Sequence, residues 1–290
     1  MFITTLIAPR GALDPALVDS LRNAWGGGEA RWLSPDEAAE FTMEQVPANR
    51  WEVWDSLQAQ HVDLVVQPAQ GRRKKMLLAD MDCTMTQQEC IDELADAAGV
   101  GEAVRAITVR AMNGELDFVA ALTERVGLLR GLPEAALAEV WEKRITYMPG
   151  GATLLATMKA QGGFTALVSG GFTYYTERVA AGLGFDEQRA NHLLIENGQV
   201  TGQVGQPVLG RQAKIEALEE ITAQLGLTDA DVIAVGDGAN DLGMLHRAGT
   251  GVALHAKPSV AAQCDVRINH GDLTALLFLQ GYGRDEFAGV

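Results

Sequence analysis

Carboxylate side chains follow two short apolar segments of the chain. Asp80 and Asp82 come directly after MLLA, and Asp237 and Asp241 come shortly after VIAV. Hard cations such as Mg²⁺ prefer oxygen ligands, usually one or two carboxylates with waters and a substrate phosphate. A carboxylate can also act as a nucleophile and form an aspartyl phosphate. These residues could therefore support metal-dependent phosphoryl transfer, with Asp82 free to act as a general acid.

A hydroxyl, glycine amides and a lysine occur where a phosphate group could bind. Ser169, Gly170 and Gly171 follow the apolar segment FTALV, and Lys214 begins a predicted helix. Hydroxyl and glycine N–H groups at a helix N-terminus suit phosphate oxygens. A lysine would offset the repulsion between a phosphate dianion and a carboxylate. Each motif alone is weak, since DxD pairs are common in turns and also bind metal–nucleotides in glycosyltransferases. Together and in this order they favour phosphoryl transfer.

The elements that must position these groups alternate between strand and helix. Buried apolar strands are predicted at residues 76–79, 164–168 and 232–235. Helical patterns come between and after them, at residues 153–159, 173–181 and 241–247. This alternation indicates an α/β fold with a Rossmann-like, mostly parallel sheet that is covered on both faces. Ligands of such sheets bind beyond the carboxyl ends of the strands, so the chemical groups should meet at one edge.

The segment between the first two core strands is too long for a simple crossover. Residues from about 88 to 144 contain four helical patterns, one of which places Phe118, Leu122 and Arg125 close together. We interpret this segment as a helical cap inserted into the core. A hairpin is predicted at residues 191–205, with Asn197-Gly198 as its turn.

The first 70 residues form a small α/β pattern of their own, and residues 71–290 form the second predicted domain. A basic run, GRRKK, follows the first pattern, and we interpret it as a solvated linker rather than a nucleic-acid patch. The middle of the N-terminal pattern is ambiguous at residues 29–46. Its clearer elements are strands at residues 2–8 and 62–66 and helices at 14–25 and 51–58.

The composition excludes several classes of protein. A formal net charge of -15 repels nucleic acid and anionic membranes. Three scattered cysteines without zinc spacing indicate a reducing compartment. The sequence shows neither a signal peptide nor a stretch of 18 apolar residues. We therefore expect a cytoplasmic protein that acts on a small molecule, without a nucleic-acid or membrane partner.

These motifs resemble those of the haloacid dehalogenase-like phosphatases, and within them the branch that acts on phosphoserine. The resemblance runs from about Leu77 to Asp265. The core motifs, which mark the superfamily, are DMDCT, SGGF, Lys214 and GDGANDLGML. The more specific motifs lie in the insert and are QECIDELA and MNGELDFVAALTERVGLLRGLP.

The resemblance implies hydrolysis of O-phosphoserine to serine and phosphate, the last step of serine biosynthesis. Asp80 would be the nucleophile and a Mg²⁺ ligand. Asp82 would be the general acid/base and would give Mg²⁺ its backbone carbonyl. Asp237 would bind Mg²⁺ directly, and Asp241 would support the metal from the surrounding shell.

The resemblance also implies how the substrate is held. Glu89 would meet the substrate ammonium and Arg125 its carboxylate. The remaining substrate-binding residues would hold the phosphoryl group (Ser169, Gly170, Lys214), line the site (Asn240) or close the pocket (Met112, Phe118).

Two parts of the chain depart from the pattern or lie outside it. Cys83 stands where the family usually has serine, and a thiol is a poorer hydrogen-bond partner than a hydroxyl. We expect a modest effect on geometry, and we interpret Cys83 and Cys90 as small packed residues. The N-terminal domain resembles a divergent ACT-like domain, which suggests amino-acid sensing or a homodimer.

Two alternatives remain open at this point. The chain could be a phosphatase or phosphotransferase for another small phosphomonoester, such as phosphohomoserine. It could also be a catalytically silent regulator that binds an amino acid, although the intact set of Asp80, Asp82, Lys214 and Asp237 argues against this.

Overall fold

The computed structural model describes residues 1–112 and 115–289, apart from the side chain of Met112. The chain divides into two compact units. The first unit comprises Met1–Leu78, Pro149–Thr165 and the chain from Leu218 onward, and the second comprises Ala79–Met148 and Ala166–Ala217. Among the described residues, the helices are too short or too polar to span a bilayer.

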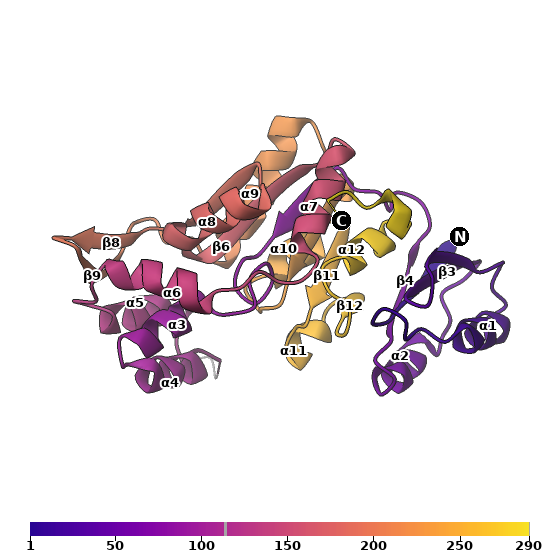
Figure 1. The fold of residues 1–290 in the computed structure, drawn as a ribbon, viewed down its shortest axis with the longest axis horizontal. Coiled ribbons are helices and arrows are strands. Elements are labelled where there is room, and N and C mark those ends of the chain that lie inside the picture. The colour runs from indigo at the N-terminus through magenta and orange to yellow at the C-terminus, as the bar shows by residue number, and fades with distance from the viewer. Residues whose placement is uncertain (113–114, 290) are drawn as a thin grey trace. The chain divides into compact units, whose positions relative to one another are not determined.

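The N-terminal part of the first unit is a four-stranded antiparallel sheet with two helices (Figure 1). The strand order is β2-β3-β1-β4, and the βαββαβ sequence of elements is ferredoxin-like. The ambiguous residues 29–46 form the β2–β3 hairpin. The elements are β1 (Phe2–Ile7), α1 (Pro15–Ala24), β2 (Arg31–Ser34), β3 (Ala38–Met43), α2 (Arg50–Gln58) and β4 (Asp63–Pro68). The two strands and two helices predicted here are confirmed, and Asp14 caps α1 by accepting from the Ala16 N–H.

Both faces of this sheet are buried. Successive residues of a strand point to opposite faces, and one face contributes Leu6, Phe41 and Leu64 to a core shared with α1 and α2. On the other face, Glu40 and Asp63 are buried and bind the rest of the unit. The Asp63 carboxylate accepts backbone N–H groups of residues 269–271.

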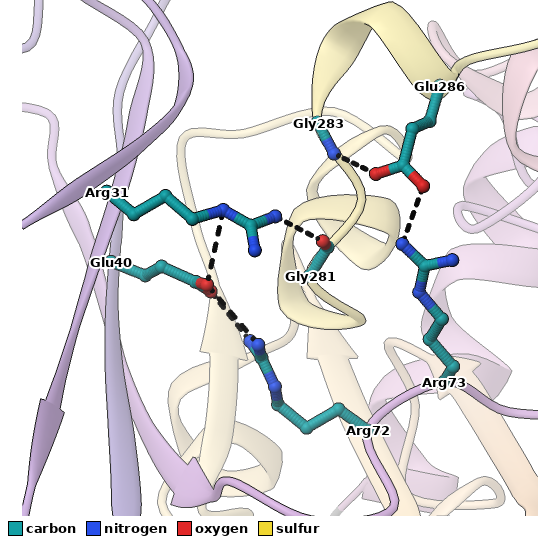
Figure 2. Close-up of polar contacts among 7 residues, drawn as sticks. All are labelled: Arg31, Glu40, Arg72, Arg73, Gly281, Gly283 and Glu286. Atoms are coloured by element: carbon teal, nitrogen blue, oxygen red, sulfur yellow. Dashed lines mark hydrogen bonds and ion pairs between the residues drawn. The ribbon is translucent and has the colours of Figure 1, made fainter.

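Arginines join this second face to the C-terminal segment. Arg72 donates to Glu40 at 2.7 Å, and Arg31 donates to the Gly281 carbonyl at 2.8 Å (Figure 2). Arg73 binds Glu286, whose carboxylate also accepts the Gly283 N–H. Residues of the basic run at 71–75 therefore form intramolecular ion pairs. The sequence predicted a solvated linker, but the Arg72 side chain is largely buried against Glu40.

The core of the protein is a six-stranded sheet in the order β12-β11-β10-β5-β6-β7. The pairs β6–β7, β10–β11 and β11–β12 are parallel, which confirms the predicted α/β class. Its strands are β5 (Met76–Ala79), β6 (Phe164–Phe172), β7 (Glu187–Asn191), β10 (Val232–Gly236), β11 (Thr250–Leu254) and β12 (Val266–Ile268). β6 does not end at Val168 as predicted. It continues through Ser169 and Gly170, although its register with β7 shifts between Val168 and Phe172.

Helices follow the strands much as the sequence predicts. In its described residues, the predicted insert contains four helices: α3 (Cys90–Ala97), α4 (Gly101–Met112), α5 (Phe118–Leu128) and α6 (Ala135–Arg144). The other helices are α7 (Gly151–Ala160), α8 (Thr173–Leu183), α9 (Arg211–Leu225), α10 (Leu242–Arg247), α11 (Pro258–Ala261) and α12 (Ala275–Leu279). Two short 3-10 helices lie at Asp229–Asp231 and Arg284–Glu286.

The predicted hairpin is also present, as β8 (Leu193–Glu196) and β9 (Gln199–Val204). Asn197 and Gly198 both have positive φ, 54° and 74°, as a type I′ turn requires. Backbone hydrogen bonds from Gly131 and Glu134 to the hairpin tie it to the segment between α5 and α6.

Candidate active site

Asp80 lies at the end of β5 and is paired with a buried lysine. Its carboxylate is 2.5 Å from Lys214 Nζ, and the two residues are 5% and 1% exposed. Lys214 comes from the first turn of α9, which follows the β8–β9 hairpin. The apolar strand β5 is fully buried and fixes the backbone of Asp80. The site therefore holds a buried carboxylate beside the amino group of a buried lysine.

Asp82 is buried beside Asp80 and is held through both oxygens. Oδ1 accepts the backbone N–H of Cys90 at 2.9 Å, and Oδ2 is 3.4 Å from Ser169 Oγ. Burial raises the pKa of Asp82, while hydrogen bonds from Cys90 and the charge of Lys214 oppose that rise. A carboxyl group with a raised pKa is suited to donate a proton near neutral pH.

The end of β6 provides a compact set of polar groups. Ser169 is 1% exposed, and its Oγ accepts the Gly171 N–H at 2.8 Å. A Cβ atom on Gly171 would lie 2.7 Å from Asp82 Oδ2, so glycine is required for this close approach. The Gly170 carbonyl accepts from Asn191 Nδ2 at 2.9 Å.

Asp237 and Asp241 follow β10, in the loop that leads to α10. Asp241 is fully buried, and its Oδ2 accepts the Gly238 N–H at 2.9 Å. Asp237 and Asn240 are partly exposed. β10 is the neighbour of β5 in the sheet, so the ends of these two strands carry Asp237 and Asp80.

Asp80, Asp237 and Asp241 form a group of carboxylates that could hold a metal ion. The donors are all oxygen atoms, without a histidine or cysteine among them. A hard divalent cation fits such a set, and soft thiolate-preferring ions do not. The residues present thus suit a hard divalent metal ion.

Glu89 and Arg125 lie on the first and third helices of the insert. Glu89 is the N-cap residue of α3, and Arg125 lies near the end of α5, where its Nε donates to the Ala121 carbonyl at 3.3 Å. Burial and then the charge of Asp82 raise the pKa of Glu89 well above its usual range, and Arg125 opposes that rise. An incoming ammonium group would favour the ionised form of Glu89. The pair therefore offers a carboxylate and a guanidinium beside the buried acids.

Phe118 covers the end of β6. A Cβ atom on Gly170 would lie 2.9 Å from Phe118 Cζ, and one on Gly210 would lie 3.0 Å from Cδ1 of the same ring. The ring thus lies against both glycines. The side chain of Met112, the other residue expected to close the pocket, lies outside the described part of the chain.

Two residues near the site carry contacts that the sequence did not reveal. Asn191 is buried, and its side chain bonds the backbone of Gly170 and Leu209. Cys90, interpreted as a packed residue, presents its N–H to Asp82. Backbone contacts of this kind leave no motif, and the position of Cys90 at a helix start was the only available signal. Cys83 has a positive φ of 54°, which any non-glycine side chain adopts at some cost.

Comparison with known proteins places the chain in a family and gives it close relatives. A family model described as haloacid dehalogenase-like hydrolase matches residues 77–246. A phosphoserine phosphatase of Haemophilus influenzae is 47% identical over 204 residues. That match covers 70% of this chain but only 65% of the relative's length.

Some solved structures resemble nearly the whole chain, and others resemble about 70% of it. A haloacid dehalogenase family hydrolase from Salmonella enterica serovar Typhi superposes with a TM-score of 0.87 at 32% identity, over 96% of this chain and 98% of that one. A substrate-bound phosphoserine phosphatase superposes with a TM-score of 0.67 at 40% identity, over 71% of this chain and 97% of that one.

Proposed function

The chain belongs to the haloacid dehalogenase-like hydrolases, and from that premise we propose that it hydrolyses O-phosphoserine to serine and phosphate. The observation that carries this proposal is the buried ion pair of Asp80 and Lys214, with Asp82 buried two residues further on. The phosphoserine phosphatases among its relatives support the choice of substrate.

Asp80 acts as the nucleophile in this proposal. Its carboxylate oxygen attacks phosphorus, and the bond from phosphorus to the serine oxygen breaks. Asp82 gives its proton to that leaving oxygen. Water then attacks the aspartyl phosphate, gives a proton to Asp82 and releases phosphate, which regenerates both residues.

The phosphoryl group is held by residues that are buried at the ends of β5 and β6 and in α9. Lys214 offsets the negative charge that an incoming phosphate adds beside Asp80. Ser169 and Gly170 offer donors to the remaining oxygens, and Asn240 lines the site. Exclusion of water by Phe118 strengthens these charged contacts.

We propose Mg²⁺ as the metal, held by Asp80, Asp237 and the Asp82 carbonyl, with Asp241 supporting it. When bound, the ion supplies positive charge that neutralises the phosphate dianion. Its preference for short bonds and octahedral geometry distinguishes it from Ca²⁺, which accepts more ligands.

The serine part of the substrate is recognised by the helical cap, residues 88–144. Glu89 pairs with the ammonium group, and Arg125 binds the carboxylate. Met112 and Phe118 close the pocket around them. We place this reaction in the cytoplasm, an assignment supported by three scattered cysteines that lack zinc spacing.

A panel of phosphomonoesters tests the proposal. Phosphate release should be fastest with O-phosphoserine, slower with phosphohomoserine and slowest with alkyl phosphates that lack the amino and carboxyl groups. Excess chelator should abolish release, and Mg²⁺ should restore it far better than Ca²⁺. Full activity in chelator rules out the metal, and a preference for phosphohomoserine moves the assignment to another substrate.

A further inference from the structure

The first helix of the insert holds the carboxylate of Asp82. The Cys90 N–H donates to Asp82 Oδ1 at 2.9 Å, and both residues are buried. Cys90 is the first residue of α3, and Glu89 before it has an extended backbone with φ −86° and ψ 109°. The first N–H groups of a helix have no partner within the helix. The bond to Asp82 therefore satisfies a donor that would otherwise be buried without one.

The second carboxylate oxygen of Asp82 faces the end of β6. Ser169 Oγ is 3.4 Å from Oδ2, and the Cα of Gly171 comes close enough that a Cβ atom would lie 2.7 Å from this oxygen. Ser169 and Gly171 belong to the segment that is proposed to hold the phosphoryl group. Oδ2 thus lies on the side of the residues that are proposed to hold the phosphoryl group.

We propose that the Cys90 N–H is the positioning group for Asp82, because its bond to Oδ1 fixes the rotation of the carboxyl group and turns Oδ2 toward the segment that is proposed to hold the phosphoryl group. This inference rests on the proposed function and deepens it. A protonated carboxyl group has one donor oxygen and one acceptor oxygen. An N–H aimed at Oδ1 occupies a lone pair of that oxygen and fixes the rotation of the group.

The position of Asp82 matters for proton transfer in both steps of the reaction. In the first step the Asp80 oxygen–phosphorus bond forms and the phosphorus–leaving oxygen bond breaks. The Oδ2–H bond of Asp82 breaks at the same time, and the leaving oxygen gains that proton. In the second step water loses a proton to Oδ2 and its oxygen bonds phosphorus, while the bond to Asp80 breaks.

The choice of leaving group can distinguish a role of the Cys90 N–H in positioning Asp82 from a role in folding alone. A serine or other alkyl alkoxide is a poor leaving group and needs the proton. A p-nitrophenolate leaves readily without one. A misplaced Asp82 should therefore slow the first step for an alkyl phosphate much more than for p-nitrophenyl phosphate.

The substitution Cys90→Pro removes the backbone N–H at position 90 and should leave the rest of α3 intact. Proline is favoured at the first helical position, and it requires an extended residue before it, as Glu89 already is. Cys90→Ala loses the same thiol but keeps the N–H, so it is the matched reference. Single-turnover phosphorylation of Asp80 would be measured for both variants with O-phosphoserine and with p-nitrophenyl phosphate.

Relative to Cys90→Ala, Cys90→Pro should slow phosphorylation by O-phosphoserine about tenfold or more, as loss of one aligned hydrogen bond to a catalytic group permits. The loss with p-nitrophenyl phosphate should be much smaller. Equal losses on both substrates, or none with O-phosphoserine, would overturn the proposal. If the wild-type protein turns over another alkyl phosphate instead, the proposed substrate fails, and the same comparison runs on that ester.

A measurement that does not depend on the proline variant uses the wild-type fold. The Cys90 amide proton, bonded to a carboxylate, should resonate downfield and move upfield in Asp82→Ala. An amide resonance that does not respond to this change means that the bond is absent, and the proposal fails whatever the enzyme hydrolyses.

Discussion

Asp80 and Lys214 are both almost inaccessible to solvent, and their charges depend on each other. A charge buried without a partner costs several kcal/mol, and each of these two groups provides the other with a partner of opposite charge. Asp82, two residues away, has a pKa that burial raises. The two neighbouring carboxyl groups thus have environments suited to different tasks, one as nucleophile and one as acid.

Arg125 is the residue whose replacement separates substrate recognition from chemistry. If its guanidinium binds the substrate carboxylate, each such charged contact contributes about 1.5–3 kcal/mol, or roughly ten- to a hundredfold. Arg125→Ala should lower kcat/KM for O-phosphoserine by that factor and leave a phosphomonoester without a carboxylate nearly unaffected.

The matched control is Arg105→Ala, an arginine of α4 that pairs with Asp96 on the surface. It should change neither substrate's kcat/KM. If Arg125→Ala weakens turnover of both substrates equally, Arg125 is structural, and recognition of serine would then rest on the relatives alone.

At the scale of elements, strands and helices with clear periodicity could be predicted from the sequence. The apolar segment before Asp80 is strand β5, and the Asn197-Gly198 signal is a hairpin turn. The β2–β3 hairpin could not be predicted, because residues 38–41 are buried on both faces and give no alternation. Strand β6 extends past Val168 since the Asn191 side chain supports its irregular end.

The candidate site also has features that could be predicted from the sequence and features that could not. Acidic residues at strand ends could be predicted because parallel strands bring their carboxyl ends to one edge. The hydrogen bonds from the Cys90 N–H to Asp82 and from the Asn191 side chain to the Gly170 carbonyl could not be predicted. Each of them involves a backbone group that every residue has. The roles expected of the site residues, the cap included, stay predictions until the variants are measured.

For the whole molecule, the N-terminal sheet has an intramolecular partner. Its second face contains buried acids that bind residues 269–271 and an arginine of the linker. Gln67 donates to the Leu279 carbonyl, and Arg284 binds Glu37. The ACT-like character of this unit and its part in a homodimer stay predictions, which light scattering of the intact protein can test.

These contacts make a prediction about removal of residues 1–70. A chain that begins at Gly71 would expose the apolar α12 and leave Arg72 and Arg284 without Glu40 and Glu37. We expect it to be much less stable than the intact protein, with turnover retained only where the remainder stays folded. Thermal unfolding and phosphate release of the two chains measure this.

Arg284→Ala in the intact chain removes one of the contacts that the truncation would remove, the ion pair with Glu37. It should lower stability by about 1–3 kcal/mol, since Glu37 loses a charged partner, without changing kcat. A shortened chain that is fully folded yet inactive would contradict the assignment of all chemistry to residues 71–290.

The most direct test of the central claim compares wild type with Asp80→Asn for phosphate release from O-phosphoserine in Mg²⁺. An amide cannot form the phosphoryl ester that the carboxylate forms, so turnover should be abolished while circular dichroism stays that of the folded protein. The wild-type protein should release phosphate and, with beryllofluoride, form a stable mimic of the aspartyl phosphate. Substantial turnover by Asp80→Asn would contradict covalent catalysis at this residue.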